Sequence, residues 1–344
     1  MRKQENNFKL LSLREEQELS NKELILYYEK LREYALNRKL TNTTPGATTI
    51  APKLKKITNK IALRVTDILS GCKTIKIFDG TENIPNEPVI FAHTHQGILD
   101  NFAWIPATPR HSITLHSSKV KKLLVLLQLN TGLVLVSKDK NNSQNRINAK
   151  LDMIKLLLQG HSISYFPESA WNLSPNKLHL PMSFGFLDIA KKANVAIIPV
   201  VDEFTYDSST EIEKITKIHI RFGKPIHINI NDSLYDKLEE YSEQVSTIRW
   251  NLIEEKGIFL RSEIQDDEYT NYLKGNIRNL EMGGIDINVE RENLWNYNSF
   301  FYKLHHINDI PLNKSGELEE MDYVKCLNLK PNYNNAFLYN KRLK

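Results

Sequence analysis

The sequence predicts an α/β fold with a mixed central β-sheet flanked by helices. Between residues 73 and 201, short apolar runs alternate with helical patterns, which is typical of a sheet layered with helices. The chain has 344 residues, of which 41% are hydrophobic and 25% are charged, so it can bury a sizeable core. We expect an N-terminal helical segment over residues 1–72, the α/β domain over 73–232, and a helical and irregular C-terminal extension over 233–344.

The N-terminal segment is predicted to contain two helices. Ser20 and Glu23 form a capping-box pair, and apolar residues at helical spacing then continue to about Arg38. A breaker-rich stretch over 41–46 separates this helix from a second one, expected over 53–69. The second helix has an apolar stripe flanked by basic residues. Such a helix either packs on the sheet or lies on an anionic membrane, and the pattern leaves both open.

The central region is predicted to supply the strands of the sheet. They are expected at residues 89–92, 113–116, 133–137, 163–166 and 196–201, followed by a strand pair at 218–222 and 226–230. One intervening helix should be ended by Gly160 and another near Asn194. Asp232 is the expected N-cap of a long helix that follows. Beyond about residue 281 the periodicity is weak.

Composition narrows the classes of partner. The net charge of +5 is mild and the basic residues are not densely clustered, so nucleic acid is not an expected partner. Cys72 and Cys326 stand in no metal-ligand or redox spacing, so neither a disulfide framework nor a cysteine zinc site is expected. The start of the sequence lacks a signal-peptide pattern, and the most apolar stretch, 123–136, is too short to span a bilayer. We expect a cytoplasmic chain whose membrane contact is at most peripheral.

Reactive side chains follow the predicted strand 89–92. His93, His95 and Asp100 stand where an α/β sheet presents functional groups, beyond the carboxyl end of a strand. Residues five apart on a helix are separated by roughly 140°, so His95 and Asp100 suit a strand-to-helix turn near Gly97 instead. There the carboxylate can hold one imidazole nitrogen while the other faces a substrate. Taken alone, such a pair is more often an ordinary loop histidine and a capping aspartate, so other segments must decide.

Three further segments follow predicted strands in the same way. Phe166-Pro167-Glu168-Ser169 brings a carboxylate to a strand end, and Gly132 to Lys138 brings a cation to another. Residues 197–200 are a buried strand that contains a proline. Each segment also has an ordinary explanation, as a turn, a solvated lysine or core packing.

Together, the four segments resemble the motifs of the glycerophospholipid acyltransferase family, which includes bacterial 1-acylglycerol-3-phosphate acyltransferases. The resemblance extends over roughly residues 88–201. His95 and Asp100 match the family's His-x4-Asp motif, and residues 197–200 match its apolar proline motif. The other two motifs depart from the family pattern, with Lys138 in place of an arginine, Ser169 in place of a glycine, and Trp171 in place of a second arginine.

The resemblance implies acyl transfer from a thioester, either acyl-CoA or acyl carrier protein, with no bound cofactor and no metal. It implies that His95 is the general base and that Asp100 orients it, while backbone groups at the Gly97 turn steady the oxyanion. The acceptor is expected to contact Lys138, Glu168, Ser169 and Trp171. Because two arginines that would grip a phosphate are missing, we expect an acceptor other than simple lysophosphatidic acid, such as another lysolipid or an envelope glycan precursor.

Two other functions remain open from the sequence. His93 and His95 form a His-x-His pair, which also begins zinc hydrolase sites, although no second group of ligands is recognisable. A non-catalytic peripheral membrane protein is the other alternative, and the basic helix over 53–69 motivates it.

Overall fold

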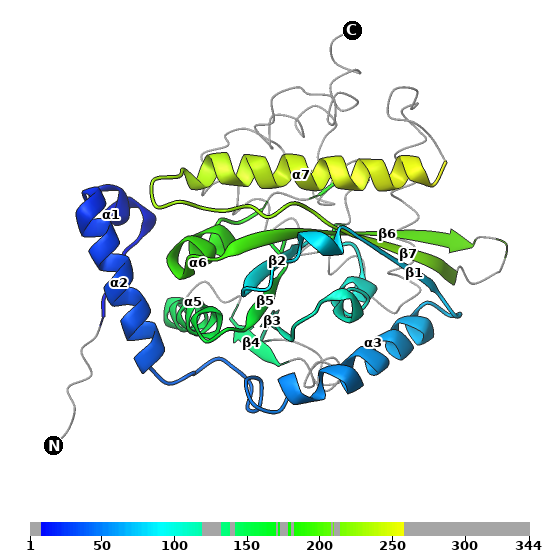
Figure 1. The fold of residues 1–344 in the computed structure, drawn as a ribbon, viewed down its shortest axis with the longest axis horizontal. Helices are drawn as coiled ribbons and strands as arrows, with labels where there is room; N and C mark the ends of the chain where they lie inside the picture. Colours follow the sequence, from blue (N-terminus) through cyan, green and yellow to red (C-terminus); the bar gives the residue numbers. More distant parts are fainter. Residues whose placement is uncertain are drawn as a thin grey trace, which may run out of the picture.

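The computed structural model describes residues 8–118, 132–137, 142–169, 171–172, 178–179, 182–207, 209 and 214–257. Within them the chain forms a seven-stranded sheet in the order β1-β7-β6-β2-β5-β3-β4 (Figure 1). Neighbouring strands are parallel except for β6 and β7, so the sheet is mixed and the predicted α/β class is confirmed. The strands are β1 (Ile75–Asp79), β2 (Val89–His93), β3 (Ser112–Ser117), β4 (Leu133–Val136), β5 (Ser162–Tyr165), β6 (Ala196–Asp207) and β7 (Lys214–Phe222).

The sheet is buried on both faces. Side chains of β2 alternate, so that Ile90 and Ala92 join the core on one face while Val89 and Phe91 join the core on the other. The first core is completed by helices α2 (Asn21–Asn37), α5 (Ser143–Leu158), α6 (Gly185–Ala193) and α7 (Leu234–Glu255). The second is completed by α3 (Lys55–Leu69) and the short helices η3 (Ile98–Asn101) and η4 (Ile105–Ala107). The remaining short helices are α1 (Leu13–Gln17), η1 (Pro52–Leu54) and η2 (Thr81–Asn83).

Several predicted elements differ from the structure. Strand β1 was not predicted, and residues 226–230 make only one isolated bridge, between Ile226 and Ile197, instead of a strand. The long helix α7 is capped by the side chain of Ser233, which accepts a hydrogen bond from the Asp236 N–H. Asp232 was therefore the wrong cap, because its carboxylate accepts from the Asn229 N–H in the preceding turn.

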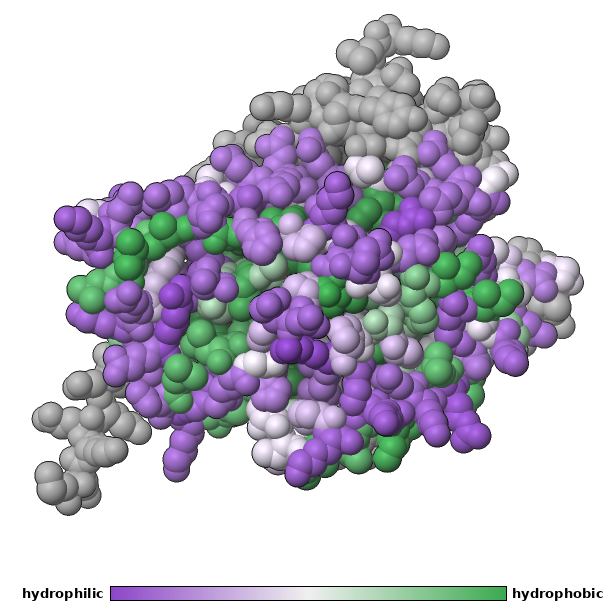
Figure 2. All heavy atoms as spheres, in the orientation of Figure 1, coloured by the Kyte–Doolittle hydropathy of each residue, from purple (hydrophilic) through white to green (hydrophobic). Residues whose placement is uncertain are grey.

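Helix α3 contacts the sheet through a face offset from its apolar stripe. Its buried residues are the small Thr58, Ala62 and Thr66, whereas Ile57 is 53% exposed and Ile68 is 75% exposed. The predicted helix is confirmed, and Val65 of the stripe packs against the core while Ile57 and Ile68 face outward. In Figure 2, apolar and hydrophilic side chains are interleaved along the edge of the molecule that α3 occupies.

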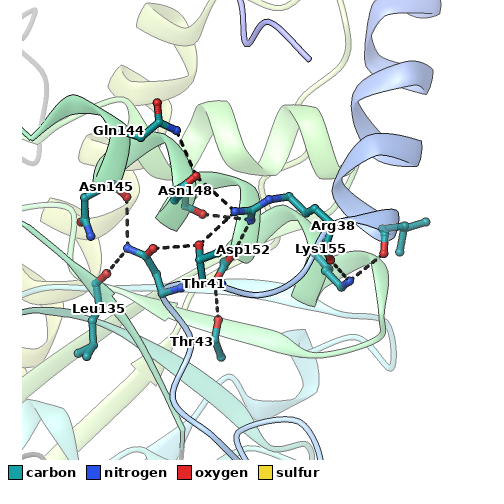
Figure 3. Close-up of polar contacts among 11 residues, drawn as sticks. Arg38, Thr41, Thr43, Leu135, Gln144, Asn145, Asn148, Asp152 and Lys155 are labelled. Carbon is teal, nitrogen blue, oxygen red and sulfur yellow. Dashed lines mark hydrogen bonds and ion pairs between the residues drawn. The ribbon is translucent and has the colours of Figure 1, made fainter. Parts of the chain in front are cut away.

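The segment between α2 and α3 is fastened to α5 by one buried carboxylate. Asp152 accepts hydrogen bonds from Arg38, from the Thr41 and Asn42 N–H groups at 3.0 and 2.8 Å, and from the Thr43 hydroxyl at 2.9 Å (Figure 3). Four donors offset the cost of burying this charge. Residues 42–44 are thereby held along the edge of β4, where Thr43 and Val134 form an antiparallel bridge.

A second buried ionic cluster fastens the N-terminal helices to α6. Lys192, which is 1% exposed, contacts Glu16 at 2.6 Å and also pairs with Asp188. The Tyr28 hydroxyl donates to Glu16 at 2.8 Å. Removing Lys192 would leave the buried Glu16 without its cation, so this pair fixes where the N-terminal helices dock. Among the helices that the structure describes, none has the length and apolar character needed to cross a bilayer.

Candidate active site

The predicted pair is assembled at the carboxyl end of β2. His95 Nδ1 lies 3.0 Å from Asp100 Oδ2, the imidazole is 16% exposed, and the carboxylate is fully buried. Asp100 lies in η3, directly after the turn, as the spacing of the two residues required. If Nδ1 carries the proton that the carboxylate accepts, Nε2 has its lone pair available to a substrate.

Asp100 is held rigidly by its own loop. Besides His95, its Oδ2 accepts the N–H groups of Gln96 at 2.7 Å and Gly97 at 2.9 Å. Its Oδ1 accepts the Asn101 side-chain amide at 3.0 Å. Two backbone N–H groups on one oxygen fix the carboxylate at the start of η3, much as an N-terminal cap is fixed. The orientation of His95 therefore follows from backbone geometry.

Gly97 differs in detail from its predicted role. Its φ of −179° is extended backbone that any residue adopts, so the turn does not require glycine for conformational reasons. Its N–H donates to Asp100, which positions the pair. The oxyanion role of this turn stays a prediction.

The loop after β5 holds the backbone of His95. Glu168, which is fully buried, accepts a hydrogen bond from the His95 N–H at 2.8 Å, and the Asn172 N–H donates to the His95 carbonyl at 2.7 Å. β5 pairs with β2 in parallel, so both loops leave the same edge of the sheet. The Phe-Pro-Glu segment therefore lies against the turn that carries His95, and Glu168 contacts the His95 backbone. Its predicted place near the acceptor stays a prediction.

Aromatic rings surround the imidazole. The ring centroids of Phe166 and Trp171 lie 4.5 and 5.7 Å from that of His95. Trp171, predicted at the acceptor site, thus lies beside His95. Ser169 has a φ of 58°, a left-handed conformation that favours glycine, which explains why the family motif has a glycine there. Lys138, the remaining predicted residue, lies outside the described residues.

His93 lies among aromatic side chains. It is fully buried, its ring centroid lies 4.5 Å from that of Trp104 and 5.0 Å from that of Phe166, and burial lowers its pKa to about 3, helped by the neighbouring charge of His95. Over the described part of the chain, side chains with the mutual spacing of metal ligands occur at Asp79, His219 and Glu255, a group that excludes His93 and His95. In that group Arg221 already bonds both carboxylates.

Three residues of the site were not predicted. Gln96 and Asn101 bind Asp100, and the Gln96 amide also donates to the Asp202 carbonyl at 2.8 Å. Asp202 lies one residue beyond the predicted strand 196–201, on β6. The sequence did indicate this residue, because an acidic side chain directly after a buried apolar run lies either at the surface or at a functional site.

One comparison with known protein families includes the residues of this site. Residues 77–202 match the model of the family described as Acyltransferase. No curated protein sequence matches at a significant level. Among solved structures, the chain is similar to the 1-acyl-sn-glycerophosphate (LPA) acyltransferase PlsC from Thermotoga maritima. The sequence identity is 18%, the TM-score is 0.45, and the match covers 67% of this chain and 89% of that chain.

The family match includes the strand and turn that carry His95 and Asp100, and the segment that carries Glu168. Sequence family and buried polar geometry therefore identify the same region. Residues 77–202 therefore match an acyltransferase domain.

Proposed function

We propose that the chain moves an acyl group from acyl-CoA or acyl carrier protein to a hydroxyl of a lysolipid or an envelope glycan precursor. The observation that carries the proposal is the 3.0 Å contact between His95 and the buried Asp100, inside the domain that matches the acyltransferase family. Both donors present the same thioester, so the chemistry at His95 is common to them.

In the proposed reaction, His95 Nε2 takes the proton of the acceptor hydroxyl as its oxygen attacks the thioester carbonyl. Asp100 stabilises the imidazolium that forms. When the tetrahedral intermediate collapses, the carbon–sulfur bond breaks and the imidazolium returns the proton to the leaving thiolate. Protons and charge balance without a metal or a covalent enzyme intermediate.

The acceptor is proposed to lie against Trp171, with Glu168, Ser169 and Lys138 as further contacts. Trp171 supports this because its ring flanks His95, and its half-buried indole offers a flat apolar face where the family has an arginine. An indole cannot grip a phosphate as a guanidinium does. We therefore propose an acceptor other than simple lysophosphatidic acid.

Helix α3 is proposed to bring the enzyme to an anionic membrane surface. Exposed Ile57 and Ile68 share its outer side with basic residues, and an open groove on this helix is lined by Ile57, Lys60, Ile61, Leu63 and Arg64. Apolar side chains can enter the headgroup region while cations meet the lipid phosphates. Co-sedimentation with anionic vesicles tests this: Ile57→Ser/Ile68→Ser should lose binding. Ile25→Ser, which alters an exposed residue on α2, should not.

The reaction itself is tested with labelled acyl-CoA and acyl carrier protein against a panel of lysolipids and glycans, with products identified by mass spectrometry. His95→Ala should fold normally and lose turnover, whereas His227→Ala, which alters an exposed histidine outside the domain, should keep it. Activity retained by His95→Ala contradicts the mechanism. If lysophosphatidic acid is acylated faster than every other acceptor, the proposed acceptor class is wrong.

A further inference from the structure

A second buried carboxyl lies beside the catalytic pair. Asp202 is fully buried in β6, and neither of its oxygens has a hydrogen-bond partner within the described residues. Asp100, by contrast, accepts four hydrogen bonds. A buried carboxylate without donors is far more costly than a neutral carboxylic acid. The two carboxyls therefore differ sharply in how well each can hold a negative charge.

The position of Asp202 ties it to the catalytic turn. Gln96 connects the two carboxyls, since its N–H donates to Asp100 Oδ2 and its side-chain amide donates to the Asp202 carbonyl. Along β6, Val200 and Phe204 point to the core that contains Phe91 and Trp104, and Asp202, midway between them, shares that face. Its carboxyl is therefore on the apolar side of the sheet, under η3.

The groups around Asp202 all disfavour its charge. On its face, the neighbouring strand β7 contributes Ile218, Ile220 and Phe222, and the neighbouring strand β2 contributes His93, which is neutral. Burial, followed by the charges of Asp100 and Glu203, raises the pKa of Asp202 well above its usual range. The cations nearby, Arg249 and Lys256, pair with Glu203, whose side chain points to the opposite face.

We propose that Asp202 stays a neutral carboxylic acid in the working enzyme, so that the buried carboxyl pair carries a single negative charge, on Asp100. The inference rests on the proposed role of His95 as base. One carboxylate stabilises the imidazolium formed during the reaction. A second would hold His95 protonated before the reaction and remove the base from the site.

The protonation of Asp202 is tested by unfolding in urea between pH 5 and pH 8, with Asp202→Asn as the neutral isostere. A proton held in the folded state and released on unfolding makes stability fall as pH rises above the unfolded pKa. The wild-type unfolding constant should therefore rise relative to that of Asp202→Asn by about tenfold per pH unit. A ratio that is constant over this range overturns the proposal. Asp152→Asn, which changes a buried carboxylate with four donors, is the control whose ratio should stay constant.

Two further measurements complete the test. At pH 7 the infrared difference spectrum of wild type minus Asp202→Asn should contain the C=O stretch of a carboxylic acid, and a carboxylate band in its place refutes the proposal. In acyl transfer, the acid limb of the pH–rate profile should lie at the same pH for Asp202→Asn as for the wild type. If Asp202 were charged in the wild type, the acid limb of Asp202→Asn should instead lie about one pH unit below that of the wild type. If Asp202→Asn does not fold, Asp202→Ser replaces it.

These outcomes are separable from the proposed function. The unfolding and infrared measurements need no substrate, so they decide the state of Asp202 whatever the chain acylates. Failure of every donor and acceptor would refute the proposed function alone, whereas wild-type activity with an ionised Asp202 would refute this inference alone.

Discussion

Replacing Asp100 by asparagine removes one charge from a buried site and changes its shape very little. The asparagine oxygen should keep the two backbone N–H groups that now bind Oδ2 at 2.7 and 2.9 Å, and Asn101 can flip its amide to suit the new side chain. Local geometry should therefore survive. The change that matters is the loss of the carboxylate beside the His95 imidazolium.

The magnitude of this loss follows from the distance. With Nδ1 3.0 Å from Oδ2, the centres of charge are about 4 Å apart, and an effective dielectric constant near 20 gives about 4 kcal/mol for the pair. If this stabilisation is expressed in the transition state, kcat should fall about a thousandfold. KM for either substrate should change little, because neither binds through Asp100.

Release of free thiol from acyl-CoA in the presence of acceptor measures this effect, with thermal unfolding as the check on folding. Asp152→Asn is the matched control, because it also removes a buried carboxylate yet lies in the α5 cluster of Figure 3. That variant should lose stability and keep kcat. If folded Asp100→Asn retains more than about a tenth of wild-type kcat, the carboxylate does not stabilise an imidazolium and the reasoning is refuted.

Three other results are expected. Trp171→Arg should raise kcat/KM for lysophosphatidic acid over an uncharged acceptor by about 10- to 100-fold, since a charge-assisted phosphate contact contributes about 1.5–3 kcal/mol, and an unchanged ratio places Trp171 away from the acceptor. Ser169→Gly should raise the unfolding free energy by about 0.5–1 kcal/mol and Ser169→Val should lower it, because the backbone there has a φ of 58°. Chemical denaturation measures both values, and the opposite ranking of the two variants would contradict this. For His93, the pKa falls from 6.5 to about 3 on folding, so its contribution is complete above pH 6.5 and is lost as pH falls. From pH 7 to pH 5 the wild type should lose about 2 kcal/mol more than His93→Phe, and equal losses would show that His93 is not buried in its neutral form.

Periodicity predicted the buried elements well because their residues meet the core directly. Strands β2, β3, β4 and β5 were located within one or two residues, since each is an apolar run that ends in a turn. The capping box at Ser20 and Glu23 correctly gave the start of α2. Strand β1 was missed because it is the outermost strand and its pattern, with Ile75 64% exposed, is not that of a core strand.

Orientation and long-range polar contacts could not be predicted in this way. If α3 packed on the sheet, its apolar stripe was expected to make the contact. The contact is made instead by Thr58, Ala62 and Thr66, because small residues allow a close approach. At the site, the order of the motifs predicted that His95 and Asp100 lie together. The contacts from Glu168 and Asn172 to the His95 backbone depend on the parallel pairing of β2 with β5, which no local pattern encodes.

The two buried ionic clusters also constrain how the chain matures during synthesis. Arg38 meets Asp152 across 114 positions of sequence, and Arg32 bonds the Lys192 carbonyl across 160. At translation rates of about 5–20 residues per second, the N-terminal helices wait roughly ten seconds or more for these partners. Until residue 192 is synthesised, Glu16 lacks its ion-pair partner, and until β4 is synthesised, residues 42–44 lack the strand that they pair with. Helices α1 and α2 therefore reach their final place only after α5 and α6 have been synthesised, and their amphipathic surfaces are available to chaperones until then.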